Sequence, residues 1–263
     1  MKVAAIVVAA GASTRFGAKT QKPFFMLAGK PILVHGLEVL NRSPVINRIV
    51  LVVPASQREA VRKNIVQKYR ATKVTDIVTG GKERTDSVWN GLQALEDSEF
   101  GPTSLKLRRI KFRILPRKIR SSDLVLINDG VRPFITEKMI RDTVRTAKKT
   151  GAAIIATKVT DTIKMANPNL VIDRTIPRDN LWCVQTPQVF KFSLLFDAYT
   201  RARKKKIKVT DDAGIMEQFG IPITLVPGPI TNIKITTKED LKIAEALLKT
   251  RSQMQDVRSQ IKP

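Results

Sequence analysis

Short apolar runs alternate with amphipathic stretches over most of this chain of 263 residues. The apolar runs have the length and the Val, Ile and Leu content of buried parallel strands, and they cover residues 3–10, 48–54, 73–81, 123–130 and 152–159. The stretches between them have helical spacing and cover residues 31–43, 56–69, 83–97 and 136–151. Repeated strand–helix units of this kind predict an α/β protein with a mostly parallel sheet and helices on both faces.

Capping residues mark the ends of two of the predicted helices. Ser56 and Thr136 are expected N-caps, because a hydroxyl at this position accepts a hydrogen bond from a backbone N–H of the first turn. Gly151 is expected to end the second of these helices, since glycine adopts the left-handed backbone of a helix C-terminus. His35, the single histidine of the chain, lies at helical spacing in an apolar stretch and is expected to be part of a packed helix.

Two segments interrupt the alternation. Residues 98–122 separate a predicted helix from the next strand by far more than the usual few residues. Residues 160–180 form two short strand patterns around an Asn-Pro-Asn turn, and this hairpin arm is expected to pair with another subunit. The predicted organisation is one domain of residues 1–250, which contains the basic insertion and the arm, followed by a polar tail of residues 251–263.

The net charge is strongly positive. The chain has 47 Lys and Arg residues against 23 Asp and Glu residues, for a formal charge of +24. Residues 105–120 hold eight cations and no acid, and residues 201–208 hold six cations. Composition alone indicates a polyanion as partner, with nucleic acid first. The rest of the excess of Lys and Arg is scattered over predicted helix surfaces, which argues against a dedicated nucleic-acid surface. The insertion of residues 98–122 is interpreted as a solvent-exposed loop, or as a contact with an anionic membrane, nucleic acid or a protein partner.

Cysteine and histidine usage limits the compartment and the chemistry. Cys183 is the single cysteine, so an internal disulfide is excluded and a reducing compartment, the cytoplasm, is expected. Because Cys183 lies in the apolar stretch LWCVQTP, we expect a packed thiol. With one histidine and one cysteine, a zinc site or a Ser-His or Cys-His catalytic pair is not expected. No apolar run approaches the length of a membrane span.

The first apolar run has two interpretations. Met1 and Lys2 followed by residues 3–12 resemble the start of a secretory signal. The apolar core is short and one cation precedes it, so a buried strand that ends at Gly11 is favoured. Such strands carry ligand-binding loops at their carboxyl ends.

Polar groups gather where the predicted strands end. The segments in question are AAGASTRFG and Lys22, TGGKERTDS, NDGVRP, KVTDTIK and NIKITT. They are rich in glycine, Arg, Lys and Thr, with Asp129 as the pivotal acid, and a set of this kind binds phosphates rather than abstracting protons from carbon. The first loop matches neither the G-x-x-x-x-G-K-[ST] nor the G-x-G-x-x-G pattern, but its small residues still allow backbone N–H groups to approach a phosphate chain.

These segments resemble a known enzyme family. AAGASTRFG followed by QKPF is similar to the signature of nucleotidyltransferases that couple a nucleoside triphosphate to a sugar or polyol phosphate. TGGKERTDSVWNGL, NDGVRPF, DTIK, LWCVQTPQVF and VTDDAGIME leading to NIKITTKEDL resemble the 2-C-methyl-D-erythritol 4-phosphate cytidylyltransferases in the same order along the chain. The resemblance implies a single Rossmann-like domain with a mostly parallel, mixed sheet and a protruding β-hairpin arm. It also implies transfer of CMP from CTP to methylerythritol phosphate in the non-mevalonate isoprenoid pathway.

The resemblance also implies roles for particular residues. The catalytic residues would be Arg15, Lys22 and Lys234, which stabilise the charge at the α-phosphate as pyrophosphate leaves. The CTP-binding residues would be Ala9, Ala10, Gly11, Gly81, Lys82, Ser87 and Asp129. The residues that bind the polyol phosphate would be Arg132, Thr162, Arg178, Thr186 and Thr210. Thr162 and Arg178 lie on the arm and would serve the neighbouring subunit of a homodimer, while no protein metal site is implied and Mg²⁺ would be held mainly by the triphosphate.

Several positions depart from the family pattern. Gln21 precedes Lys22 where the family has proline, Lys82 stands at a position that is often acidic, and Asn128 replaces the usual histidine before Asp129. The basic insertion has no counterpart in the pattern. A sister family that makes CDP-ribitol shares most of the motifs, so a ribitol-5-phosphate cytidylyltransferase is one alternative. A basic nucleotide- or nucleic-acid-binding module without catalysis is the alternative from another class.

Overall fold

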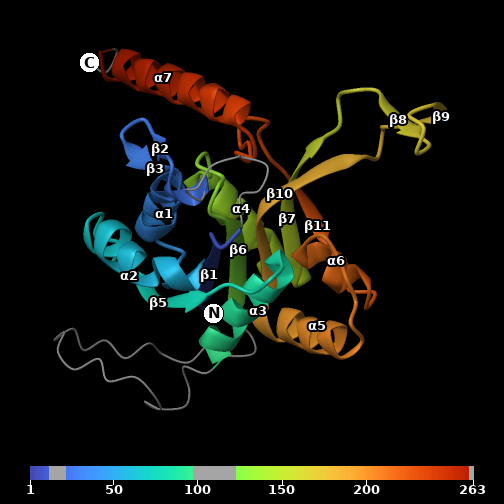
Figure 1. Cartoon of the computed structure of the whole chain (residues 1–263), viewed down its shortest axis with the longest axis horizontal. Helices are drawn as coiled ribbons and strands as arrows, with labels where there is room; N and C mark the ends of the chain where they lie inside the picture. Colours follow the sequence, from blue (N-terminus) through green and yellow to red (C-terminus); the bar gives the residue numbers. More distant parts are fainter. Residues whose placement is uncertain (12–21, 97–122, 261–263) are drawn as a thin grey trace.

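The chain folds around one mixed sheet of seven strands (Figure 1). The computed structural model describes residues 1–11, 22–96 and 123–260. The strand order is β11-β7-β10-β6-β1-β4-β5, with β1 Val3–Val8, β4 Arg48–Val53, β5 Val74–Thr79, β6 Leu124–Asp129, β7 Ala152–Lys158, β10 Trp182–Lys191 and β11 Thr224–Pro227. All neighbouring pairs are parallel except those of β10, which runs antiparallel to β6 and β7. The expected mostly parallel, mixed sheet is confirmed.

Helices cover both faces of the sheet because successive side chains of its strands point to opposite faces. From β1, Val3, Ala5 and Val7 pack with helices α1, α2 and α4, whereas Ala4 and Ile6 pack with α3, α5 and α6. The helices are α1 Ile32–Arg42, α2 Arg58–Val61, α3 Arg84–Glu96, α4 Glu137–Thr150, α5 Phe192–Lys204, α6 Asp212–Glu217 and α7 Lys238–Gln260. The central strands are therefore apolar on both faces, which is why they appear in the sequence as continuous apolar runs.

Short elements complete the fold. The 3₁₀ turn η2 Lys22–Phe24 leads into the two-stranded pair β2 Met26–Leu27 and β3 Lys30–Pro31. A third apolar cluster, which includes Leu27, Ile32 and Ala244, joins this pair to α7. Helix α7 crosses the boundary predicted at residue 250 and ends at Gln260, so helix continues through most of the polar tail. Within the described parts of the chain, every helix is too short or too polar to span a membrane.

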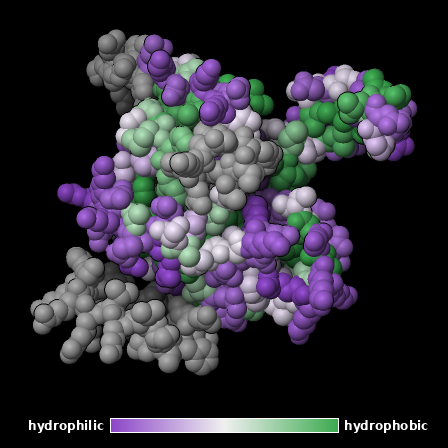
Figure 2. Space-filling model, in the orientation of Figure 1, coloured by the Kyte–Doolittle hydropathy of each residue, from purple (hydrophilic) through white to green (hydrophobic). Residues whose placement is uncertain are grey.

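The predicted hairpin projects from the body of the molecule (Figure 1). Strands β8 Ile163–Ala166 and β9 Ile172–Ile176 pair antiparallel around the Asn-Pro-Asn turn. Leu170, at the tip, is 88% exposed, and Val171 and Ile172 are each 60% exposed. The arm therefore presents apolar side chains away from the core, and Figure 2 shows apolar surface along the arm.

Of four local predictions, three are confirmed and one is wrong. Thr136 accepts a hydrogen bond from the Met139 N–H and Gly151 adopts the left-handed conformation at the end of α4, as expected. Ser56 is not an N-cap: Pro54 caps a 3₁₀ turn, η3 Ala55–Gln57, that comes before α2. The π-helical turn η4 Arg62–Gln67 follows α2. His35 lies in α1 as predicted, with its Nε2 2.8 Å from the Leu27 carbonyl oxygen.

The expectation of a packed thiol at Cys183 is wrong, because this cysteine is exposed. The pairing of β10 explains the error. Cys183 pairs with Thr157 of β7 on one side, but the pairing of β10 with β6 covers Gln188 to Lys191. At Cys183 the strand has thus left the part of the sheet that is flanked on both edges, and the thiol lies at the base of the arm.

Candidate active site

The carboxyl ends of β1, β5 and β6 converge on one edge of the sheet. The Ala9 N–H donates to the Val52 carbonyl at 2.8 Å, and the Gly130 N–H donates to the Val8 carbonyl at 2.8 Å. Gly80, the residue after β5, lies so close to the loop after β1 that a β-carbon there would be 2.2 Å from the Ala10 β-carbon. Glycine is therefore needed at position 80 to bring the two chain segments together.

A pocket of about 440 Å³ opens at this convergence; we call it the nucleotide pocket. Its walls come from the loops that follow β1, β5 and β6, from η2 and from the segment before α7. The lining residues are Val8, Ala9, Ala10, Gly11, Lys22, Pro23, Gly81, Lys82, Glu83, Arg84, Ser87, Asp129, Val131 and Lys234. Small residues and cations dominate this wall, so the pocket suits a phosphorylated ligand that approaches the backbone.

A second pocket of about 300 Å³ adjoins the first; we call it the acceptor pocket. Its lining residues are Arg84, Asp129, Arg132, Val184, Gln185, Thr186, Gln188, Thr210, Asp211 and Lys234. Arg84, Asp129 and Lys234 line both pockets. Two bound molecules would consequently meet beside these three charged side chains.

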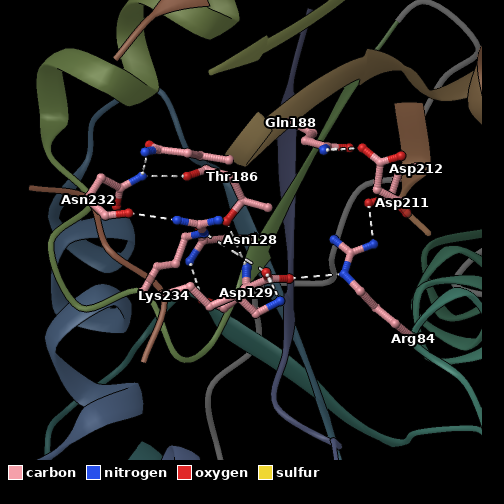
Figure 3. A network of polar contacts seen from close by, with 11 residues as sticks. Arg84, Asn128, Asp129, Thr186, Gln188, Asp211, Asp212, Asn232 and Lys234 are labelled. Atoms are coloured by element: carbon pink, nitrogen blue, oxygen red, sulfur yellow. Dashed lines mark hydrogen bonds and ion pairs between the residues drawn. The ribbon is translucent and has the colours of Figure 1, made fainter. Parts of the chain in front are cut away.

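Asp129 is a buried carboxylate that faces three cations (Figure 3). Its Oδ1 lies 3.0 Å from Arg84 Nε, its Oδ2 lies 2.8 Å from Lys234 Nζ, and Arg132 Nε is 4.0 Å away. Burial would by itself raise the pKa of Asp129, but the charges of Arg84, Lys234 and Arg132 outweigh this effect and hold the pKa below its usual range. Asp129 is therefore ionised at neutral pH.

The acid dependence of stability follows from this depressed pKa. A carboxyl with a folded pKa below its unfolded value of about 3.9 adds stability that is complete above that value and lost as the pH falls further. We expect the native chain to be more stable than Asp129→Asn, and we expect this difference in unfolding free energy to be larger at about pH 6 than at about pH 3. Urea unfolding of both proteins at the two pH values measures this, and a gap that does not change with pH would contradict it.

Thr186 and Asn128 hold the backbone of Asp129 in place. The Asp129 N–H donates to Thr186 Oγ1, and Thr186 Oγ1 donates to Asn128 Oδ1, each at 3.1 Å. The register of β10 on β7 shifts between Val184 and Gln188. This irregularity releases Thr186 from regular strand pairing, as is common beside active sites.

Arg132 is fixed from the other side of the acceptor pocket. Its Nη1 donates to the Asn232 carbonyl at 2.6 Å. The Asn232 side chain is fully buried and donates to Gln185 Oε1 at 2.8 Å and to the Thr186 carbonyl at 2.9 Å. The segment before α7 is thus bonded to β10, which places Arg132 and Lys234 at the same pocket.

A helix cap positions Lys234 and receives Lys22. Asp240 Oδ2 accepts from the N–H groups of Thr236 and Thr237 at 2.7 and 2.9 Å, and the Asp240 N–H donates to Thr237 Oγ1 at 3.3 Å. This reciprocal arrangement is a capping box at the start of α7. Lys22 Nζ donates to the Thr236 carbonyl at 3.2 Å, so both lysines are gathered at the segment that precedes the helix.

Most of the predicted site residues lie at the two pockets. Ala9, Ala10, Gly11, Lys22, Gly81, Lys82, Ser87, Asp129 and Lys234 line the nucleotide pocket, and Arg132, Thr186 and Thr210 line the acceptor pocket. Thr162 and Arg178 lie on or beside the arm, outside the linings of these two pockets, and Arg178 Nη1 donates to the Thr160 carbonyl. Arg15 and the basic insertion of residues 98–122 lie outside the described residues.

Sequence reasoning missed Arg84, Gln185, Asp211 and Asp212. Asp211 caps α6 by accepting from the Gly214 N–H at 2.9 Å and also accepts from Gln188 Nε2 at 2.9 Å. Asp212 points inward and pairs with Arg84 Nη1 at 2.8 Å. A signal was present in the sequence, because Arg84 is a cation at the start of a predicted helix, where the helix dipole disfavours positive charge.

The fold and the joined pockets define a nucleotidyltransferase, and comparisons with known proteins agree. The model of one family, described as "IspD: 2-C-methyl-D-erythritol 4-phosphate cytidylyltransferase", matches residues 3–101 and 115–250. The chain belongs to this family. The resemblance inferred from the sequence is confirmed, as is the expectation of an enzyme of the cytidylyltransferase class.

Individual relatives cover nearly the whole chain. The 2-C-methyl-D-erythritol 4-phosphate cytidylyltransferase of Alkaliphilus oremlandii is 41% identical over 250 residues, which are 95% of this chain and 96% of the relative. The Syntrophus aciditrophicus enzyme of the same name is 41% identical over 248 residues, with 94% and 96% covered. The crystal structure of 4-diphosphocytidyl-2C-methyl-D-erythritol synthase from Anaerococcus prevotii superposes with a TM-score of 0.75 at 32% identity and covers 94% of this chain and 96% of that one.

The family model leaves residues 102–114 unmatched. They lie inside the basic insertion and hold five cations and no acid. The central part of the insertion, residues 102–114, is therefore a feature of this chain beyond the matched family pattern, whereas its two ends are matched.

Proposed function

We propose that this enzyme transfers CMP from CTP to 2-C-methyl-D-erythritol 4-phosphate, releases pyrophosphate, and acts in the non-mevalonate isoprenoid pathway in the cytoplasm. The observation that carries the proposal is the junction of the two pockets at Arg84, Asp129 and Lys234. A transferase of this class must hold a nucleotide and a phosphorylated acceptor at once, with the reacting atoms adjacent. The family membership supports the identity of both substrates.

CTP is assigned to the larger pocket. The backbone of Ala9, Ala10 and Gly11, the cation of Lys22 and, in the loop that follows them, Arg15 would hold the triphosphate. Gly81, Lys82 and Ser87 form the wall that would contact the cytosine. The hydroxyl of Ser87 accepts from the Gly81 N–H at 3.1 Å and donates to the Glu83 carbonyl at 3.1 Å, so this wall is rigid before the base arrives.

Methylerythritol phosphate is assigned to the smaller pocket. Arg132, Thr186 and Thr210 would bind its phosphate and hydroxyl groups. A phosphate oxygen of the acceptor attacks the α-phosphorus of CTP in line, the bond from the α-phosphorus to the bridging oxygen breaks, and pyrophosphate leaves with that electron pair. Lys234 stands between the pockets, where its charge would stabilise the extra negative charge of this transition state.

The donor groups of the nucleotide pocket fit a magnesium ion held mainly by the substrate. Among the described residues there is no group of three or more side chains that could hold a metal, and Asp129 and Glu83 are the carboxylates that line this pocket. Mg²⁺ is commonly bound by one or two carboxylates together with substrate phosphates. When bound, the ion would neutralise part of the triphosphate charge.

The arm is assigned to a homodimer interface. Its exposed Leu170, Val171 and Ile172 are apolar side chains that a second subunit would cover. Thr162 and Arg178 would then reach the acceptor pocket of the neighbouring subunit. The proposed organisation is a cytidylyltransferase domain of residues 1–250 that contains both the arm and the basic insertion.

Pyrophosphate release with different acceptors tests the function. The purified chain is incubated with CTP and Mg²⁺, and methylerythritol 4-phosphate is compared with ribitol 5-phosphate at equal concentrations. Release with the first acceptor and not with the second is the expected result. Release with ribitol 5-phosphate alone would reassign the acceptor, and release with neither would favour a binding module without catalysis.

A further inference from the structure

Arg84 occupies a place that local helix chemistry disfavours. It is the first residue of α3, and a cation there opposes the positive end of the helix dipole. Two carboxylates from distant parts of the chain compensate for it: Asp129 at the end of β6, 3.0 Å from Arg84 Nε, and Asp212 at the start of α6, 2.8 Å from Arg84 Nη1. A cation kept at an unfavourable helix position, with two carboxylates to compensate for it, indicates a functional constraint.

Asp212 forms a pair with Tyr199, and both residues are buried in the core next to Arg84. Asp212 is fully buried, and Tyr199 of α5 is 1% exposed. The Tyr199 hydroxyl donates to Asp212 Oδ1 at 2.5 Å, while Asp212 Oδ2 accepts from Arg84. Burial and the neighbouring Asp212 raise the pKa of the Tyr199 hydroxyl, so the hydroxyl keeps its proton. Both oxygens of Asp212 are thereby engaged, and the guanidinium is held in one orientation.

Because the Arg84 guanidinium is fixed, the two oxygens of Asp129 have different partners. Oδ1 faces Arg84, and Oδ2 faces Lys234 at 2.8 Å. We propose that Arg84, anchored by the Asp212–Tyr199 pair, is a positioning residue that sets the rotation of the Asp129 carboxylate and so holds Lys234 at the junction of the two pockets. Without Arg84, the Asp129 carboxylate could rotate, and Lys234, which pairs with its Oδ2, would move with it away from the junction of the two pockets. The inference rests on the function proposed above.

The test compares kinetic constants with stability in a set of variants. Arg84→Gln removes the charge, Arg84→Lys keeps the charge without the planar fork that binds two carboxylates, and Tyr199→Phe removes the hydroxyl that holds Asp212. Arg203→Gln is the matched control, because Arg203 pairs with Asp86 of the same helix at 2.7 Å but lies outside the linings of both pockets. For each protein, kcat, the KM values for CTP and methylerythritol phosphate, and the thermal midpoint are measured.

Arg84→Gln is expected to lower kcat about ten- to a hundredfold while each KM changes less than about threefold. The kcat of Arg84→Lys is expected to be as low as that of Arg84→Gln, whereas Arg203→Gln is expected to keep the native kcat. Tyr199→Phe lowers kcat by about two- to fivefold in the native background and has no further effect in Arg84→Gln, because both act through one unit. A native kcat in Arg84→Gln, or independent effects of the two substitutions, would overturn the inference.

Chemical rescue separates positioning from folding. Millimolar methylguanidinium added to Arg84→Ala is expected to restore part of kcat without changing the thermal midpoint. A loss of folded protein with an unchanged kcat per folded site would show that Arg84 serves stability alone. If the native chain releases no pyrophosphate, the proposed function fails first, whereas an active native chain with an active Arg84→Gln variant defeats this inference alone.

Discussion

Lys234→Ala is expected to lower kcat by about 10²- to 10³-fold, which is the range for losing one preorganised stabilising group at the reacting centre. Lys234 lines both pockets and lies 2.8 Å from Asp129, so its ammonium group is already in place before the substrates bind. Lys22→Ala is expected to give a loss of similar size, because Lys22 also lines the nucleotide pocket. Initial rates of pyrophosphate release at saturating substrate give the two values.

A lysine on helix α7, away from both pockets, provides the control. Lys249 lies on the exposed surface of α7, and Lys249→Ala should retain the native rate. Turnover close to native in both Lys22→Ala and Lys234→Ala would reject the proposed mechanism.

Mixing two impaired variants is expected to restore activity if each site is built from two subunits. Arg178→Ala carries a defective arm and Lys234→Ala a defective pocket. In a mixed dimer, one site combines both defects and the other combines two intact parts. After subunit exchange at equal concentrations, about one quarter of all sites is therefore native, since half of the dimers are mixed.

The experiment is run at low acceptor concentration, where the loss of Arg178 should chiefly weaken binding of the polyol phosphate. Each variant mixed with the native chain serves as the reference for subunit exchange. Activity that stays at the sum of the separate variants, although exchange is complete, would contradict a shared site.

The apolar pattern was sufficient to predict the sheet because its strands are covered on both faces. β1, β4 and β6 are almost entirely buried, so their sequences carry no polar alternation and are recognised as apolar runs. The antiparallel direction of β10 was not visible in this pattern, because the direction of a strand depends on its partners and not on its own composition. The exposure of Cys183 was missed for the same reason: it depends on where β10 leaves β6.

The site was predictable to the extent that its residues follow strands. Asp129 and Gly81 stand at the ends of apolar runs, and the ends of parallel strands meet at one edge. Asp212 was missed because its role depends on packing between α6 and α3, which are separated by more than a hundred residues in the sequence. Arg84 offered a local signal, because it is a cation at the start of a helix.

The most direct test of the central claim follows the α-phosphorus of CTP. The native chain is incubated with CTP that carries radioactive phosphorus at that position, Mg²⁺ and methylerythritol 4-phosphate, and the labelled product is identified by chromatography against authentic standards. We expect the label in a diphosphate that joins cytidine to methylerythritol, formed together with one pyrophosphate for each molecule of product. Label in free CMP, or label that stays on the protein, would contradict direct transfer between the two pockets.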